Sequence, residues 1–239
     1  MLVTKLSIII PAYNEEKTIV QLLDTIRDVK LNNNIEKEII VVDDCSYDST
    51  SSIVTNYISR NPHTPIYYFK HTINMGKGAA VHTGIAKATG EYLVIQDADL
   101  EYDPEEYNDL LKPVLKGKAD VVYGSRFMGG NPHRILFFWH SIGNKFLTFL
   151  CNMVTNLNLT DMETGFKLFN TKLIQSLVLE EKRFGFEPEV TIKIARIPAI
   201  RIYEIGISYY GRTYMDGKKV SWRDGVHAIH CIIKYGLLK

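Results

Sequence analysis

Cysteine is scarce in this sequence, and its spacing matches no common framework. Only three cysteines occur among 239 residues, at positions 45, 151 and 231, and none belongs to a CxxC pair. A disulfide-stabilised domain or a structural zinc site needs several suitably spaced cysteines. The sequence therefore excludes both classes and predicts a reduced, cytoplasmic protein.

The sequence also lacks an excess of charge and a long hydrophobic run. Lysine and arginine total 28 against 27 aspartates and glutamates, which argues against a protein that coats nucleic acid. No run of about 18 apolar residues is present, so no membrane-spanning helix is expected. The start, MLVTK, lacks the features of a signal peptide. The composition is that of a globular protein, and we expect one domain over residues 1–239.

The glycine motifs that cradle phosphate groups are missing as well. No GxGxxG follows the first expected strand, and the segment NMGKG at 74–78 does not have the GxxxxGK[ST] spacing of a P-loop. If the chain binds a nucleotide, the negative charge of its phosphates must be neutralised by other groups.

Short apolar runs alternate with amphipathic segments in the first half of the chain. The expected strands cover residues 6–10, 38–42, 66–70, 92–96 and 121–123. The expected helices cover residues 18–29, 49–59, 78–88 and 104–115, the last one capped by Asp103. This alternation predicts an α/β fold with an open, mostly parallel sheet and helices on both faces. Ligands of such sheets bind beyond the carboxyl ends of the strands.

The second half of the chain has a less regular pattern. Residues 134–154 indicate one or two amphipathic helices, and residues 167–169 a short strand. A helix over 187–197, a strand over 200–210 and a helix from Trp222 complete the expected elements.

Acidic loops follow three of the expected strands, at residues 11–16, 43–50 and 97–101. In extended backbone, Asp97, Asp99 and Glu101 would point to one side. Three converging carboxylates repel one another unless a cation lies between them, and oxygen ligands select Mg²⁺ or Mn²⁺. Such a metal could bridge a diphosphate and stabilise it as a leaving group. The alternative is that Asp97 and Asp99 only end a strand and cap the next helix.

Taken together, these segments resemble glycosyltransferase family 2 of the GT-A fold, and within it the dolichyl- and polyprenyl-phosphate sugar synthases. The likeness rests on IIIPAYNE at 8–15, VVDDCS at 41–46, NMGKGAA at 74–80, QDADLE at 96–101, YGSRF at 123–127, DMETGFKLF at 161–169 and YYGRTY at 209–214. The resemblance implies a Rossmann-like three-layer α/β/α sandwich. It also implies an inverting hexosyltransferase.

The resemblance also implies roles for individual residues. The nucleotide of the donor, UDP-glucose or GDP-mannose, would contact Pro11, Tyr13, Glu15, Asp44, Lys77, Asp97 and Ala98. Asp97, Asp99 and Glu101 would hold Mg²⁺ or Mn²⁺. Asp99, Asp161 and Glu163 would be the catalytic carboxylates. The family has a glycine where this chain has Cys45, so a differently shaped loop is expected there.

On the acceptor side, the resemblance implies a polyprenyl or dolichyl phosphate. Candidate contacts to the acceptor phosphate or the diphosphate are Arg126, Arg212, Lys218 and Lys219. Residues 214–219 resemble a lid over the diphosphate. We expect a donor half over 1–125, an acceptor half over 126–213, and the lid with a C-terminal helix over 214–239.

Two alternatives and a membrane contact stay open at this point. The acceptor could instead be a sugar hydroxyl of a growing glycan, with Asp161 or Glu163 as the base, or the chain could be a non-catalytic nucleotide-sugar-binding module. The resemblance implies C-terminal membrane helices in many close relatives, and none is expected within residues 1–239. The apolar segments 135–150 and 226–238 could contact a membrane peripherally, or a membrane-spanning partner subunit could serve instead.

Overall fold

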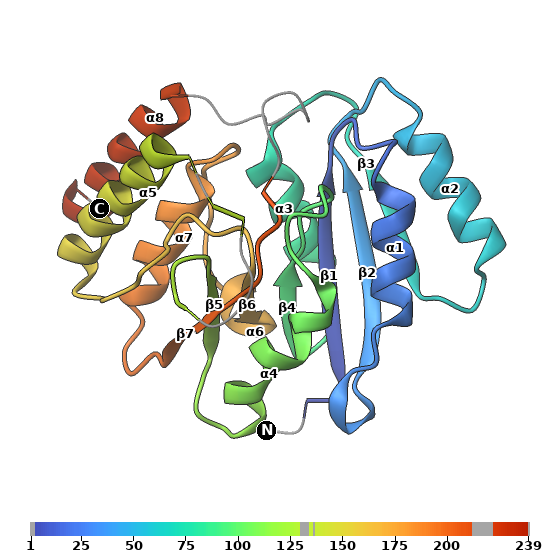
Figure 1. Cartoon of the computed structure of the whole chain (residues 1–239), viewed down its shortest axis with the longest axis horizontal. Coiled ribbons are helices and arrows are strands. Elements are labelled where there is room, and N and C mark those ends of the chain that lie inside the picture. The colour runs from blue at the N-terminus through green and yellow to red at the C-terminus, as the bar shows by residue number, and fades with distance from the viewer. Residues whose placement is uncertain (1–2, 130–133, 136, 212–221, 239) are drawn as a thin grey trace.

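A seven-stranded sheet forms the centre of the computed structural model, which describes residues 3–129, 134–135, 137–211 and 222–238 (Figure 1). The strand order is β3-β2-β1-β4-β6-β5-β7. The strands are β1 (Lys5–Ala12), β2 (Glu36–Asp43), β3 (Ile66–Lys70), β4 (Tyr92–Ile95), β5 (Val121–Ser125), β6 (Lys167–Asn170) and β7 (Ile202–Gly206). The apolar runs of β1, β2, β4, β5 and β6 are buried because both faces of the sheet are covered, whereas the edge strands β3 and β7 are partly exposed.

All strand pairs are parallel except those made by β6, which runs antiparallel to both β4 and β5. The predicted mostly parallel sheet is therefore confirmed, and the first five strands end within two residues of their predicted bounds. The strand expected over 200–210 is shorter than predicted. Strand β7 pairs only with β5, from Val121 opposite Ile202 to Ser125 opposite Gly206, so its pairing stops where β5 stops.

Helices cover both faces of the sheet (Figure 1). One face is packed by α1 (Ile19–Asp28), α2 (Thr50–Arg60) and α4 (Tyr107–Leu115). The other face is packed by α3 (Lys77–Lys87), α5 (Phe138–Thr155), α6 (Thr171–Gln175), α7 (Phe186–Ala195) and α8 (Trp222–Ile233). The result is the predicted three-layer sandwich, with one apolar core on each side of the sheet. Helix α6 was not predicted.

Local sequence explains individual helices. In α1, Ile19, Leu22, Leu23 and Ile26 lie one helical turn apart and are all buried, so the amphipathic pattern meets the sheet as expected. The segment predicted as a helix from Pro104 begins with a 3₁₀ turn, Pro104–Glu106, and continues as α4. The Asp103 side chain accepts a hydrogen bond from the Glu105 amide at 3.0 Å, which confirms the predicted cap.

The order of the strands indicates at which edge of the sheet a ligand would bind. The chain runs from β1 outward to β2 and β3, then crosses back to β4 on the other side of β1. A crevice opens beyond the carboxyl ends of strands at such a reversal. Because β6 is antiparallel, the residues that precede it, 161–166, lie at this same edge.

Among the residues that the structure describes, no helix combines the length and the hydropathy that crossing a membrane requires.

Candidate active site

A cavity of about 1030 Å³ opens at the carboxyl edge of the sheet. Its walls come from the loops after β1, β2, β4 and β5, from the loop before β6, and from parts of α3, α5, α7 and α8. The predicted site residues that line it are Pro11, Tyr13, Glu15, Asp44, Lys77, Asp97, Ala98, Asp99, Glu101, Arg126 and Glu163. Asp161 lies behind the wall, and Arg212, Lys218, Lys219 and the expected lid fall outside the described residues.

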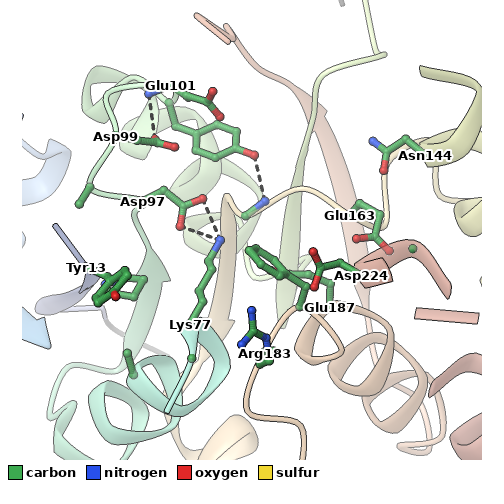
Figure 2. A pocket seen from close by; sticks show the side chains of 18 of the residues that line it. Tyr13, Lys77, Asp97, Asp99, Glu101, Asn144, Glu163, Arg183, Glu187 and Asp224 are labelled. Carbon is green, nitrogen blue, oxygen red and sulfur yellow. Dashed lines mark hydrogen bonds and ion pairs between the residues drawn. The ribbon is translucent and has the colours of Figure 1, made fainter. Parts of the chain in front are cut away.

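An ion pair between Asp97 and Lys77 lies in the wall of the cavity (Figure 2). Asp97 follows β4, and Lys77 is the first residue of α3. The Lys77 ammonium lies 2.7 Å from Oδ1 and 2.9 Å from Oδ2 of Asp97. Burial disfavours the charge on Lys77, but the carboxylate outweighs it and raises the pKa of the ammonium above its usual value.

Gly165 makes room for this pair. A Cβ atom at position 165 would lie 2.5 Å from Oδ2 of Asp97 and 3.2 Å from Nζ of Lys77. Any other residue would therefore displace the Asp97 carboxylate. The glycine of the TGF sequence at 164–166 thus has a steric role in the wall of the cavity.

The backbone after Asp97 differs from the prediction. It turns at residues 98–100, and Leu100 has a positive φ of 62°, so the extended alternation expected to align the three carboxylates is wrong. Oδ1 of Asp99 accepts a hydrogen bond from the Glu101 amide at 3.2 Å, and Oε2 of Glu101 accepts one from the Tyr209 hydroxyl at 2.8 Å.

The carboxylates of Asp97, Asp99 and Glu101 are not gathered within 4.8 Å of one another in the described part of the chain. They still offer oxygen ligands on one wall of a cavity. Magnesium needs only one or two protein carboxylates when substrate phosphates supply the other ligands, so the residues present fit a hard divalent cation.

Asp44 organises the loop that leads into α3. Its carboxylate is 2% exposed and accepts hydrogen bonds from the amides of Met75, at 2.9 Å, and Gly76, at 2.6 Å. His71 Nδ1 lies 2.7 Å from the same group. Cys45, which stands where the family has glycine, has a φ of 63°, the left-handed conformation that glycine adopts at least cost.

Arg126, which is partly buried, and the fully buried Asp161 form a two-pronged ion pair. Nε and Nη2 of Arg126 donate to the two oxygens of Asp161 at 2.7 and 2.8 Å, and the Arg126 amide donates at 3.1 Å. Asp161 is fully buried and also accepts a hydrogen bond from Asn144 at 3.2 Å. Burial opposes the charge on Arg126, but Asp161 raises the pKa of the guanidinium above its usual value. Asp161 therefore fixes Arg126, which itself faces the cavity.

Glu163 differs from the other carboxylates of the cavity. Its Oε1 atom is buried and has no hydrogen-bond partner among the described residues. Burial, reinforced by the like charge of Glu187, raises the pKa of Glu163 to about 7, against the opposing effect of Lys167. A carboxyl group whose pKa lies near neutrality can both accept and donate a proton.

Sequence analysis missed several residues that line the cavity. One is Tyr102. Others, labelled in Figure 2, are Asn144, Arg183, Glu187 and Asp224. Glu187 is 5% exposed, and one of its oxygens is bound by the fully buried Lys167. The two glutamates near the start of α7, Glu187 and Glu189, are both buried, which the sequence alone does not reveal. Arg183 carried no signal, because it precedes that helix in a charged stretch, EEKR.

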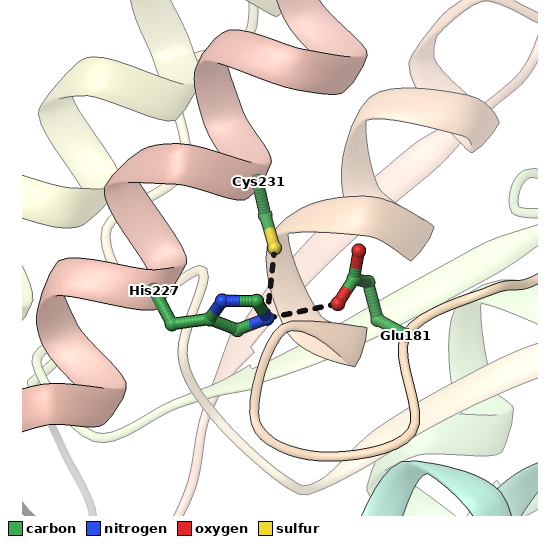
Figure 3. A group of neighbouring side chains, drawn as sticks. All are labelled: Glu181, His227 and Cys231. Atoms are coloured by element: carbon green, nitrogen blue, oxygen red, sulfur yellow. Dashed lines mark hydrogen bonds and ion pairs between the residues drawn. The ribbon is translucent and has the colours of Figure 1, made fainter.

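A second group of potential metal ligands lies outside the cavity (Figure 3). Ligand atoms of Glu181, His227 and Cys231 lie within 4.8 Å of one another. The other oxygen of Glu181 already receives hydrogen bonds from Lys234 at 3.0 Å and from Tyr235 at 2.8 Å. Burial raises the pKa of the Cys231 thiol to about 12, which favours its protonated form. We therefore interpret the group as a hydrogen-bonded cluster that ties α8 to the segment before α7.

Comparison with known proteins agrees with this architecture. Over 230 residues the chain is 30% identical to a dolichyl-phosphate beta-glucosyltransferase of Dictyostelium discoideum. The alignment covers 90% of this chain and 68% of that protein. A dolichyl-phosphate beta-glucosyltransferase of Trichomonas vaginalis is 31% identical over 227 residues, with the same coverage of both chains.

The fold is also that of a solved enzyme. The structure of glucosyl-3-phosphoglycerate synthase from Mycobacterium tuberculosis, in complex with Mn²⁺, uridine diphosphate and phosphoglyceric acid, aligns with a TM-score of 0.73. That alignment covers 98% of this chain and 79% of the synthase at 18% identity, so it shows a shared fold. The model of glycosyl transferase family 2 matches residues 7–178, and the chain is therefore a glycosyltransferase of family 2.

Proposed function

We propose that the protein transfers a hexose from a nucleoside diphosphate sugar to a polyprenyl or dolichyl phosphate, with inversion at the anomeric carbon. One observation carries the proposal: a single cavity joins the acidic wall around Asp97 to the apolar start of helix α5 at Trp139. This combination suits a charged donor and a lipid-linked acceptor. The names of the relatives support the acceptor class and favour glucose over mannose as the transferred sugar, which suits UDP-glucose as donor.

Helix α5 and the residues before it offer an apolar surface beside the cavity mouth. Phe137, Phe138 and Trp139 are 53%, 67% and 79% exposed. Residues 134–160 contain no aspartate or glutamate, so this surface does not repel anionic lipid headgroups. Exposed aromatic side chains of this kind favour the membrane interface. We therefore place the protein peripherally at the cytoplasmic face of a membrane, alone or with a membrane-spanning partner subunit.

The donor is assigned to the half formed by residues 1–125. We assign the nucleoside to the part of the cavity that Pro11, Tyr13, Glu15 and Asp44 line. Lys77 and Asp97 lie at the diphosphate. A divalent cation held by Asp97, Asp99 and Glu101 would supply positive charge that stabilises the leaving diphosphate.

The reaction is a direct displacement. An oxygen of the acceptor phosphate attacks the anomeric carbon, the bond from that carbon to the diphosphate breaks, and its electron pair leaves with the nucleoside diphosphate. A phosphate monoester is ionised at neutral pH, so it needs positioning more than a base. Arg126, held by Asp161, is placed to contact the acceptor phosphate, in the half formed by residues 126–213. Arg212, Lys218 and Lys219 are proposed for the same phosphates on sequence grounds, from the proposed lid.

A sugar-hydroxyl acceptor is the second candidate, and Glu163 is the observation that favours it. A hydroxyl must lose its proton as it attacks, and Glu163 lies in the cavity with a pKa raised to about 7. Glu163→Gln should abolish transfer to a hydroxyl and leave transfer to a phosphate largely intact. Measuring turnover of this variant with both acceptor types separates the two functions.

The direct test is an incubation of the protein with Mn²⁺ or Mg²⁺, a short polyprenyl phosphate and a panel of UDP- and GDP-sugars, read by mass spectrometry. We expect a glycosyl-phosphoprenol product with UDP-glucose. Asp99→Ala should remove the activity while the thermal unfolding curve stays unchanged. Binding of nucleotide without consumption of any donor, with either acceptor type, would instead identify a non-catalytic binding module.

A further inference from the structure

The cations of the cavity differ in how far they are already neutralised. Three described lysine and arginine side chains line it: Lys77, Arg126 and Arg183. Lys77 is paired with Asp97, and Arg126 with Asp161. The Arg183 guanidinium has no hydrogen bond, ion pair or ring contact with any residue in the described part of the chain. It is thus the cationic group of this wall that is most available to a ligand.

The many carboxylates of the cavity make the unpaired state of the Arg183 guanidinium significant. Glu15, Asp44, Asp97, Asp99, Glu101, Glu163, Glu187 and Asp224 also line it. A guanidinium among so many carboxylates would ordinarily pair with one of them. Arg183 instead extends into the cavity without pairing (Figure 2). A substrate phosphate that enters an acidic cavity needs such a group.

The backbone around Arg183 is held against the donor side. The Lys182 carbonyl accepts a hydrogen bond from the Ala79 amide at 2.9 Å, in the first turn of α3. A Cβ atom at Gly76 would lie 2.8 Å from Cγ of Arg183, so the arginine side chain packs directly over this glycine. Gly76 adjoins Lys77, and the base of the Arg183 side chain therefore lies near the Asp97–Lys77 pair.

The cluster of Glu181, His227 and Cys231 anchors the same segment from the other side (Figure 3). Oε2 of Glu181 lies 2.9 Å from Nε2 of His227, and Oε1 accepts from Lys234 and Tyr235. Residues 181 and 182 are thereby fixed to α8 and α3. This anchoring limits the backbone motion of residue 183, so less freedom remains to be lost when the side chain binds.

We propose that Arg183 binds the phosphate oxygens of a substrate in this cavity, and that it belongs to the binding machinery alongside Lys77 and Arg126. The inference rests on the proposed function, because the phosphates are those of the donor diphosphate or of the acceptor. The position of Arg183 beside Gly76 favours the donor diphosphate as its ligand. The planar guanidinium can bind two phosphate oxygens at once.

The test compares Arg183→Gln and Arg183→Lys with Lys182→Gln, a matched control at an exposed neighbouring position outside the cavity wall. Affinities for UDP and uridine are measured by titration calorimetry in Mn²⁺ buffer, and KM values are measured for donor and polyprenyl phosphate. We expect Arg183→Gln to weaken UDP binding by about 10- to 100-fold and to leave uridine binding unchanged. Arg183→Lys should recover part of the loss, and Lys182→Gln should match wild type.

The outcomes separate the two claims. A rise in KM for polyprenyl phosphate, with unchanged UDP affinity, supports the inference and assigns Arg183 to the acceptor phosphate. Unchanged UDP affinity together with unchanged KM values for both substrates overturns it, while the proposed function survives. If the wild-type protein binds neither UDP nor GDP and consumes no donor, the proposed function fails first.

Discussion

Replacing Glu163 by glutamine should make the protein's stability less dependent on pH. The pKa of the Glu163 carboxyl is raised from 4.5 to about 7, so the folded state holds its proton where the unfolded state has released it. Because the folded state binds more protons between these values, stability falls as pH rises through this window. Glutamine carries no ionisable proton, so the variant does not lose stability in this way as the pH rises.

The size of the effect follows from the shift. One pKa unit corresponds to about 1.4 kcal/mol, so the shift of Glu163 costs about 3 kcal/mol above pH 7 and under 1 kcal/mol at pH 5. The variant should therefore gain about 2.5 kcal/mol relative to wild type between pH 5 and pH 8. For a chain of this length, that gain corresponds to a relative rise in Tm of about 5 to 10 °C.

Thermal unfolding of both proteins at pH 5 and pH 8, followed by circular dichroism, measures this difference. Glu36→Gln, at an exposed position on β2, is the control and should show no pH-dependent change relative to wild type. If Glu163→Gln shifts Tm equally at the two pH values, Glu163 titrates normally in the folded protein. The argument for its protonation near neutrality would then be wrong.

Three further changes test separate parts of the site. Asp161→Asn leaves the Arg126 charge buried without its counterion, so it should lower the free energy of unfolding by about 3 to 5 kcal/mol in urea titrations, and a loss below 1 kcal/mol would contradict the buried pair. Gly165→Ala puts a methyl group 2.5 Å from Oδ2 of Asp97 and should weaken UDP binding about tenfold in calorimetry; equal affinity would show that the Asp97–Lys77 pair does not matter for the donor. Phe138→Ser together with Trp139→Ser should reduce co-sedimentation with anionic vesicles at least tenfold, because two exposed aromatic side chains are lost, and unchanged sedimentation would exclude this surface from membrane contact.

Most of the fold could be predicted because its signals are local. Strand β3 follows the predicted bounds of 66–70, and the burial of Ile19, Leu22 and Ile26 follows from their helical spacing. The reversed direction of β6 was not predictable in this way. Its residues, KLFN, read as a short strand in either direction, and only its long-range partners Leu93 and Val122 determine how it runs.

In the candidate site, too, the features with local sequence signals could be predicted and those that depend on tertiary packing could not. Asp97 and Glu15 could be predicted to face the cavity because parallel strands end at one edge. The turn at Leu100 could not be predicted, because a positive φ at leucine has no local sequence signal. The pairing of Asp161 with Arg126, and the proximity of Arg183 to Gly76, join segments far apart in the sequence and depend on tertiary packing alone.

The direction of β6 also has a consequence for how the chain folds. The parallel set β3-β2-β1-β4 is assembled from consecutive segments, whereas β5 and β7 reach it only through β6, which lies between β4 and β5. Strand β5 emerges early in synthesis but has no neighbour in the sheet until Lys167–Asn170 arrives. We therefore expect the first four strands to fold as an early unit, with insertion of β6 as the step that closes the sheet and completes the cavity.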